Sequence, residues 1–586
     1  MNTKNFARGP MRRLAMLCLL LPLFASCEKK PEYDLVVRGG TVYDGSGSAG
    51  YAGEVAIQGD RIAYVGPKAP GRAKREIDAT GKAVSPGFIN MLSWSTESLL
   101  VDGRGQGELR QGVTLEVMGE GESMGPLNEQ MKKDLVAQQV DLKYPVEWTT
   151  LGEYLALLEK KGVSVNVASL IGAATARIHL LGAEDVDPTP EQLATMQGLV
   201  QQAMEEGALG VGSALIYVPG TFAETDELVA LATTSARCGG IYMTHMRSEG
   251  RGLVEAVDET IDISRRSGAP AEIYHLKAGG KQYWPKMDDA LAHIEAARRE
   301  GIRISTDMYA YNAGATGLDA SMPPWVQAGG NAAWFARLRD PAIRKKVLAE
   351  MRSDDTDWEN LLRAAGGAEN LLIVELRKPE LKKYTGMTLA QIAEERGKSP
   401  EETAMDLVAE DETRVGTVYF LMSEEEVARK VALPYMHFGS DAAAQSAEGV
   451  FLKSGAHPRA YGNFARVLGK YVREEKRTTL EDAIRRMTSD AAAVLNLRDR
   501  GSLKPGYFAD VVVFDPAKIQ DHATYTEPHR YATGVSEVIV NGRLALENGE
   551  PTDARPGRFV RGRAWKGAEG GGCRAAASDW DWPPAR

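Results

Sequence analysis

Two histidines, His245 and His275, each follow a short apolar run that is typical of a buried strand. Their separation along the chain matches one strand–helix–strand unit, so both would lie at the same end of neighbouring parallel strands. Neutral imidazole is a common metal ligand, and two imidazoles in one pocket could hold a divalent ion. The spacing alone equally allows two unrelated core or surface histidines.

The overall composition excludes several classes of protein. At 586 residues the chain is too long for one small hydrophobic core, so we expect two or more domains. Its net charge of -10 argues against a nucleic-acid partner, which would require a basic face. The eight histidines form no HxH, HxxxH or HExxH cluster, so any metal site has to combine distant positions. We therefore expect a small-molecule substrate, and the sequence indicates no oligomeric state.

The first 27 residues have the pattern of an export signal. A basic start at Arg12 and Arg13 precedes an apolar run, residues 14–24, that is too short to span a bilayer as a stable helix. The run ends in Leu-Phe-Ala-Ser-Cys at residues 23–27, which resembles a bacterial lipoprotein cleavage box. Lipidation of Cys27 would make the protein an exported lipoprotein, anchored to a membrane and facing the periplasm. An ordinary secretory signal is the alternative.

The cysteines show no pairing pattern. Apart from Cys18 and Cys27 in the signal region, only Cys238 and Cys573 occur, and no CxxC is present. We predict that Cys238 and Cys573 are free thiols and that the chain contains no structural disulfide.

The middle of the chain alternates apolar segments with helical stretches, which predicts an α/β fold, a (β/α)8 TIM barrel over residues 84–497. Within it, residues 329–428 are rich in Ala, Glu, Lys, Arg and Leu, and we expect a helical insertion that caps the barrel. Alternating runs near both chain ends predict one small β-sandwich domain from residues 28–83 and 498–565, followed by a flexible tail, 566–586. The eight expected strands are 84–90, 113–118, 165–170, 209–213, 240–245, 272–275, 303–308 and 435–441.

Eight short motifs in a fixed order make the sequence similar to the amidohydrolase superfamily, and within it to the N-acyl-D-amino-acid deacylases, or D-aminoacylases. They are Ser85–Ile89 (SPGFI), Glu206–Gly210 (EGALG), Thr244–Arg247 (THMR), His275–Lys277 (HLK), Gly439–Asp441 (GSD), His457–Arg459 (HPR), Arg466–Gly469 (RVLG) and Glu527–His529 (EPH). A divergent member of this family is the interpretation that these motifs favour.

The sequence departs from the family at two metal-binding positions. The first strand of the superfamily normally ends in Asp-x-His-x-His, and here residues 90–94 read Asn-Met-Leu-Ser-Trp. Leu92 and Trp94 cannot ligate a metal, and Trp94 is expected to fill the vacated volume or to flank the substrate. After the second strand, relatives carry a Gly-Asn-Cys-Gly turn with a zinc-binding cysteine. Glu120 takes the place of that cysteine, or Glu122 does if the register slips by two residues.

The resemblance implies a set of site residues. Glu120, His245 and His275 would hold one divalent metal per chain, with zinc the expected ion, and Asp441 would be the catalytic carboxylate. Three further residues match positions that bind the substrate carboxylate in relatives: Lys277, Tyr309 and Arg459. Interdomain ion pairs are the alternative role for these three.

The implied activity is metal-dependent hydrolysis of a carbon–nitrogen bond other than a peptide bond. Substrates would be N-acyl-D-amino acids or small peptides that contain D-residues, and products a free amino acid and a carboxylic acid. A dipeptidase or cyclic-amide hydrolase on the same barrel is an alternative. So is a catalytically retired surface binding protein, which the loss of the His-x-His pair would favour.

Overall fold

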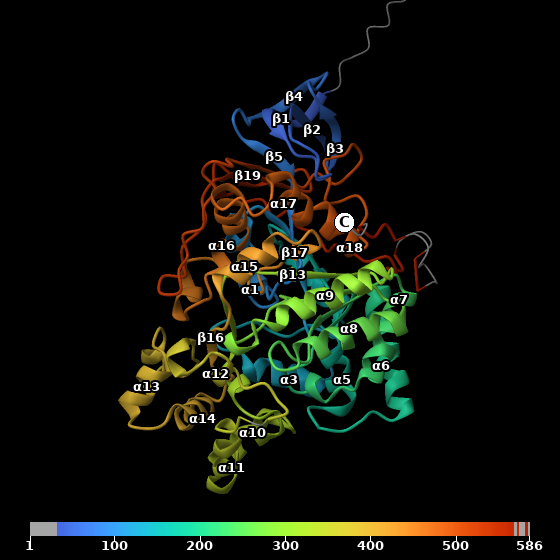
Figure 1. Ribbon diagram of the computed structural model, residues 1–586. Coiled ribbons are helices and arrows are strands. Elements are labelled where there is room, and N and C mark those ends of the chain that lie inside the picture. The colour runs from blue at the N-terminus through green and yellow to red at the C-terminus, as the bar shows by residue number, and fades with distance from the viewer. Residues whose placement is uncertain (1–31, 355, 568–570, 574–579, 584–586) are drawn as a thin grey trace, which may run out of the picture.

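The computed structural model describes residues 32–354, 356–567, 571–573 and 580–583, and it shows a mixed α/β fold (Figure 1). The expected signal at residues 1–27, with Cys27, lies outside the described residues. Within those residues, none of the helices has the length and apolar character that crossing a membrane requires.

Strands from both ends of the chain build one nine-stranded sheet. The order is β21-β20-β19-β18-β5-β1-β2-β3, and β4 pairs with β1. The two halves meet where β5 and β18 run antiparallel, with Val84 opposite Val513. The strands are β1 (Glu32–Val42), β2 (Tyr51–Gln58), β3 (Arg61–Gly66), β4 (Arg72–Asp78), β5 (Ala83–Pro86), β18 (Val511–Phe514), β19 (Val535–Val540), β20 (Arg543–Glu547) and β21 (Glu550–Pro551).

The segment 84–90, expected as one strand, is divided between two sheets at Gly87. Residues up to Pro86 belong to β5, so the terminal sheet continues past residue 83, and Phe88–Asn90 form β6 of a different sheet. Gly87 N donates to Asp510 O of the terminal sheet at 3.0 Å. A Cβ at Gly87 would lie 2.1 Å from the Thr114 side chain, so only glycine fits at this crossing.

Parallel strands form two further sheets that are joined by backbone hydrogen bonds. One sheet has the order β6-β7-β8 and the other β17-β13-β12-β11-β10-β9. Met91 N donates to Phe438 O at 3.2 Å on one side, and Leu209 N donates to Ser169 O at 3.0 Å on the other. The carboxyl ends of these strands therefore lie together. The strands are β6, β7 (Val113–Met118), β8 (Asn166–Ser169), β9 (Ile171–Gly172), β10 (Gly210–Ala214), β11 (Ile241–His245), β12 (Ala271–Ile273), β13 (Ile304–Met308) and β17 (Met436–Phe438).

Helices between these strands pack their apolar faces against the sheets. In α8 (Leu253–Ser267) the buried Leu253, Val257 and Ile261 recur every four residues, while the basic residues Arg265 and Arg266 end the helix. The other helices outside the insertion are α1 (Ser98–Val101), α2 (Gln106–Leu109), α3 (Glu129–Gln138), α4 (Leu151–Lys161), α5 (Ala173–Leu181), α6 (Pro190–Glu206), α7 (Thr225–Arg237), α9 (Lys286–Arg299), α15 (Glu424–Val431), α16 (Arg459–Arg466), α17 (Leu480–Met487) and α18 (Ser489–Val494).

The insertion is not purely helical, contrary to the prediction for residues 329–428. It contains β15 (Leu371–Glu375) and β16 (Gly416–Phe420), which pair in a three-stranded antiparallel sheet with β14 (Ala313–Gly317), a strand that precedes residue 329. Its average composition concealed two short runs rich in β-branched and aromatic residues. Its helices, at the lower left of Figure 1, are α10 (Asn331–Arg339), α11 (Pro341–Met351), α12 (Leu361–Ala364), α13 (Leu389–Arg396) and α14 (Pro400–Asp411).

Cys238 and Cys573 form a disulfide, so the prediction of two free thiols is wrong. Their sequence separation is 335 residues, and a pairing at that distance depends on tertiary proximity that no local pattern reveals. Within the expected flexible tail, the described residues are bound to the fold. Trp580 Nε1 donates to Ala493 O at 2.8 Å, and its ring contacts Trp582.

Alkylation should reveal this disulfide directly. We expect that, in denaturant without reductant, Cys238 and Cys573 resist iodoacetamide, because their sulfur atoms are bonded to each other. Peptide mass spectrometry should then find the two peptides linked, and reduction should make both thiols reactive. Alkylation of either residue before reduction would contradict the pairing.

Candidate active site

Glu120 lies in a tight turn directly after β7, between two glycines with left-handed backbone. Gly119 has φ 104° and Gly121 has φ 68°. A Cβ on Gly119 would lie 2.3 Å from Leu170 O, and one on Gly121 would lie 2.6 Å from Ala214 Cβ. Because side chains are excluded at both positions, the turn packs closely against the neighbouring strands and Glu120 is buried.

Three of the predicted ligands converge on one point. Glu120 Oε1 lies 3.0 Å from His245 Nδ1, at the end of β11, and 3.0 Å from His275 Nε2, just after β12. One ligand atom from each residue lies within 4.8 Å of the others, and all three side chains are buried. Glu122, the alternative ligand, is exposed and is not part of this group.

The chemistry of this donor set fits a zinc-like ion. One carboxylate oxygen and two imidazole nitrogens are ordinary ligands of a catalytic zinc, which keeps a further position open. Burial opposes ionisation of Glu120, but hydrogen bonds with His245 and His275 hold the pKa of this carboxyl well below its usual range. The site therefore presents an ionised carboxylate oxygen beside two imidazoles, whose nitrogens bind a divalent cation when they lose their protons to it.

Glu249, which the sequence analysis missed, lies behind the two histidines. Its Oε1 is 3.0 Å from His275 Nδ1 and 2.6 Å from Lys277 Nζ, and its Oε2 is 3.6 Å from His245 Nε2. Burial and the charge of Lys277 act against protonation of His275, but Glu249 and Glu120 outweigh them and raise the pKa of His275 to about 10. A carboxylate in this place fixes the orientation of a metal-binding imidazole. The sequence offered one signal for Glu249: it comes shortly after the strand that ends in His245.

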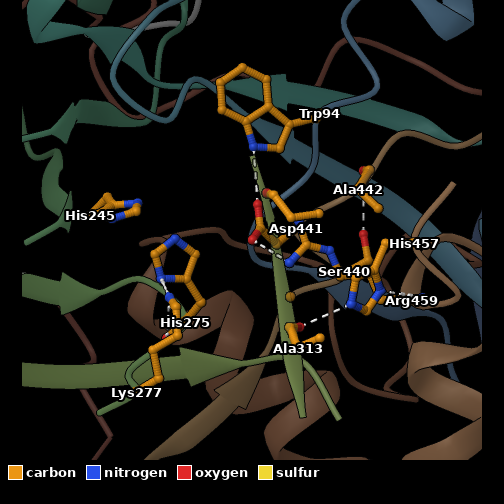
Figure 2. A network of polar contacts seen from close by, with 12 residues as sticks. Trp94, His245, His275, Lys277, Ala313, Ser440, Asp441, Ala442, His457 and Arg459 are labelled. Carbon is orange, nitrogen blue, oxygen red and sulfur yellow. Dashed lines mark hydrogen bonds and ion pairs between the residues drawn. The ribbon is translucent and has the colours of Figure 1, made fainter. Parts of the chain in front are cut away.

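Asp441 follows β17 and lies between Trp94 and Arg459, on the same side of the site as His245 and His275 (Figure 2). Its Oδ2 lies 2.8 Å from Arg459 NH1, and Trp94 Nε1 donates to its Oδ1 at 3.1 Å. Burial raises the pKa of Asp441 above its ordinary value, and the charge of Arg459 offsets only part of this effect. Its backbone has φ 49°, a strained conformation that its hydrogen bond from Asp441 N to Leu92 O, at 2.9 Å, helps to maintain.

Two of the three predicted carboxylate-binding residues, Lys277 and Arg459, flank the ring of the third, Tyr309. The guanidinium carbon of Arg459 lies 4.5 Å from the ring centroid and Lys277 Nζ lies 5.8 Å from it. Tyr309 Oη and Arg459 Nε are buried without a hydrogen-bond partner. Buried polar atoms normally have partners, so these two are available for a ligand. Lys277 is also bound to Glu249, as described above.

His457 positions Arg459, a role that its motif did not reveal. His457 Nδ1 accepts a hydrogen bond from Arg459 N at 3.0 Å, and Nε2 lies 2.9 Å from Ala313 O, at the start of β14. Burial, followed by the charge of Arg459, lowers the pKa of His457 well below its usual value. The neutral ring therefore connects the first turn of α16 to the insertion sheet (Figure 2).

Trp94 borders the site, as expected for a residue that flanks the substrate. Its side chain remains 40% exposed, and its Nε1 also donates to Glu120 Oε2 at 2.9 Å. Leu92, the other residue in place of the missing histidines, is 1% exposed and packs in the core. Neither side chain offers an atom to a metal.

This chain is similar to known deacylases over about nine-tenths of its length. A D-aminoacylase from Alcaligenes xylosoxydans xylosoxydans is 32% identical over 532 residues, covering 90% of this chain and 97% of that protein. An N-acyl-D-glutamate deacylase from the same organism is also 32% identical, with coverage of 90% and 96%. The crystal structure of N-acyl-D-glutamate deacylase from Bordetella bronchiseptica, complexed with zinc and a phosphonate inhibitor, has a TM-score of 0.74 at 30% identity and covers 91% of this chain and 100% of that one. Residues 75–545 match the model of the amidohydrolase family, and the chain belongs to that family.

Proposed function

We propose that this protein is a metal-dependent hydrolase that cleaves the amide bond of N-acyl-D-amino acids or of small peptides containing D-residues. The products are a free amino acid and a carboxylic acid. The observation that carries the proposal is the convergence of Glu120, His245 and His275 beside Asp441 and Arg459. The deacylase relatives, each similar over nine-tenths of this chain, support the substrate class.

The proposed architecture is a (β/α)8 barrel with the site at the carboxyl ends of its strands. The backbone hydrogen bonds between the two parallel sheets support a closed ring, and active sites of such barrels lie at that end. In this proposal the terminal sheet is a β-sandwich domain, and the insertion is a cap beside the mouth.

In the proposed mechanism, Glu120, His245 and His275 would hold one divalent metal per chain, with zinc the best fit to the donor set. When bound, such an ion supplies a Lewis acid that favours ionisation of water. Asp441 accepts the proton of the attacking water and later donates it to the departing amine nitrogen. A carboxyl with a raised pKa suits both roles, because it binds and releases a proton more readily near neutral pH.

Lys277, Tyr309 and Arg459 would orient the substrate through its free carboxylate. Arg459 can offer two parallel N–H groups, and the hydroxyl of Tyr309 has no competing partner. Binding the carboxylate here would place the amide bond between Asp441 and the metal ligands.

We also propose export as a lipoprotein anchored through Cys27. The Cys238–Cys573 disulfide supports a location outside the cytoplasm, because disulfides persist in oxidising compartments.

Asp441→Asn should abolish turnover and leave the fold and the metal content unchanged. Asparagine nearly matches aspartate in shape but cannot transfer a proton, so we expect kcat to fall by about 100- to 10,000-fold. The measurement is the initial rate on N-acetyl-amino acids of both enantiomers, with circular dichroism and elemental analysis as controls. A kcat within a few-fold of the wild type would refute the role of Asp441.

Arg459→Ala should raise KM for substrates with a free α-carboxylate by about 10- to 100-fold, since a charge-assisted hydrogen bond is lost. Because Arg459 also contacts Asp441, the comparison has to be made with the corresponding carboxamides, for which KM should change little. Arg459→Lys is the matched variant that keeps the charge without the fork. An equal effect on acids and carboxamides would count against this assignment.

Metal analysis should give one tightly bound equivalent per chain. Leu92 and Trp94 supply no ligand, and three protein ligands are what a single catalytic zinc requires. Zinc-replete protein, dialysed and analysed by mass spectrometry, should contain one equivalent, and Glu120→Ala should lose most of it. Two equivalents in the wild type would contradict the prediction.

A further inference from the structure

The backbone around Trp94 is bound to the segment that carries Asp441. Asp441 N donates to Leu92 O and Trp94 N donates to Ala442 O, both at 2.9 Å. These bonds join the loop after β6 to the loop after β17. The Trp94 side chain therefore starts from a position that is fixed relative to Asp441.

The single N–H of the Trp94 indole lies between two carboxylates. It donates to Glu120 Oε2 at 2.9 Å and to Asp441 Oδ1 at 3.1 Å. In each carboxylate the second oxygen faces a different group: Glu120 Oε1 faces the two histidines, and Asp441 Oδ2 faces Arg459. The indole N–H thus binds, in each carboxylate, the oxygen that the histidines or Arg459 do not contact.

Two ionised carboxylates this close to a common atom repel each other, and the charge of Glu120 acts on Asp441. The indole N–H is a donor only and does not titrate near neutral pH, so it is available to reduce this repulsion whenever both carboxylates are ionised. Among the described residues, no other side chain donates a hydrogen bond to both Glu120 and Asp441.

We propose that Trp94 is a positioning residue whose indole N–H holds Glu120 toward the metal site and Asp441 toward the substrate. The inference rests on the proposed function for its effect on turnover, but its effect on metal binding is independent of any substrate. Without the donor, both carboxylates gain rotational freedom and separate, which weakens the metal site and misplaces the proton acceptor.

Trp94→Phe tests this inference, because it removes the N–H and keeps an aromatic ring. We expect kcat to fall by about 10- to 100-fold with KM within threefold of the wild type, and zinc affinity to fall by about tenfold. Zinc affinity is measured by competition with a chromophoric chelator, which needs no turnover. Trp325→Phe is the matched control, since Trp325 Nε1 donates to Glu350 Oε2 at 2.9 Å within the insertion. This control should leave all three quantities unchanged.

Several outcomes would overturn the proposal. One is a Trp94→Phe variant with kcat and zinc affinity both within threefold of the wild type. Another is a rise in KM at unchanged zinc affinity, which would make Trp94 a substrate contact. Equal losses in Trp325→Phe would show a general effect of losing an indole hydrogen bond. If the wild type hydrolyses no N-acyl-D-amino acid, the proposed function fails, and the zinc titration still decides whether Trp94 holds Glu120.

Discussion

The burial of one carboxylate, that of Glu120, is the constraint on which the site depends. An isolated buried charge costs several kcal/mol, so such a group persists only where hydrogen bonds and opposite charges compensate it. Here two imidazoles share one oxygen and an indole binds the other. These three partners follow three different strands, β11, β12 and β6, and Glu120 itself follows β7. The compensation exists only when all four strand ends are assembled. The charge of Glu120 is therefore stabilised only in the folded protein, and local unfolding of any of these strands would disrupt the site.

Opposite charges alternate outward from this carboxylate. Glu249 lies behind the histidines and binds Lys277, while Asp441 binds Arg459 on the other side. Each of these four charged groups therefore has a partner of opposite sign, and buried polar atoms without a hydrogen-bond partner include Tyr309 Oη, Arg459 Nε and His245 Nε2. A substrate carboxylate would complete the pattern by supplying a partner for Tyr309 and Arg459.

Strand-end histidines were predictable because a short apolar run followed by a polar residue describes a buried parallel strand and its functional end. Glu120 was placed by register with related sequences, and the structure brings it to both histidines. Glu249 was missed because a lone acidic residue in a loop resembles any solvated turn, although it lies only four residues after His245, the last residue of β11. The division at Gly87 was also missed: Pro86-Gly87 is a possible break, but only the tertiary hydrogen bonds assign the residues on its two sides to different sheets. The disulfide was missed because it depends on proximity in space. The insertion strands were missed because the composition of the whole insertion is typical of helices.

The junction of β5 and β18 has a consequence for how the chain is made. Synthesis delivers residues in order, so β1–β5 emerge long before β18–β21, and β5 then has an unpaired edge. Exposed edges of this kind invite pairing with other chains. The next strand, β6, leads directly to Trp94 and the site. Gly87, which precedes β6, donates a hydrogen bond to Asp510, a residue that is also synthesised late. A nascent chain that stops short of its last strands would thus carry every proposed catalytic residue and still lack Asp510, which anchors the first strand of the site.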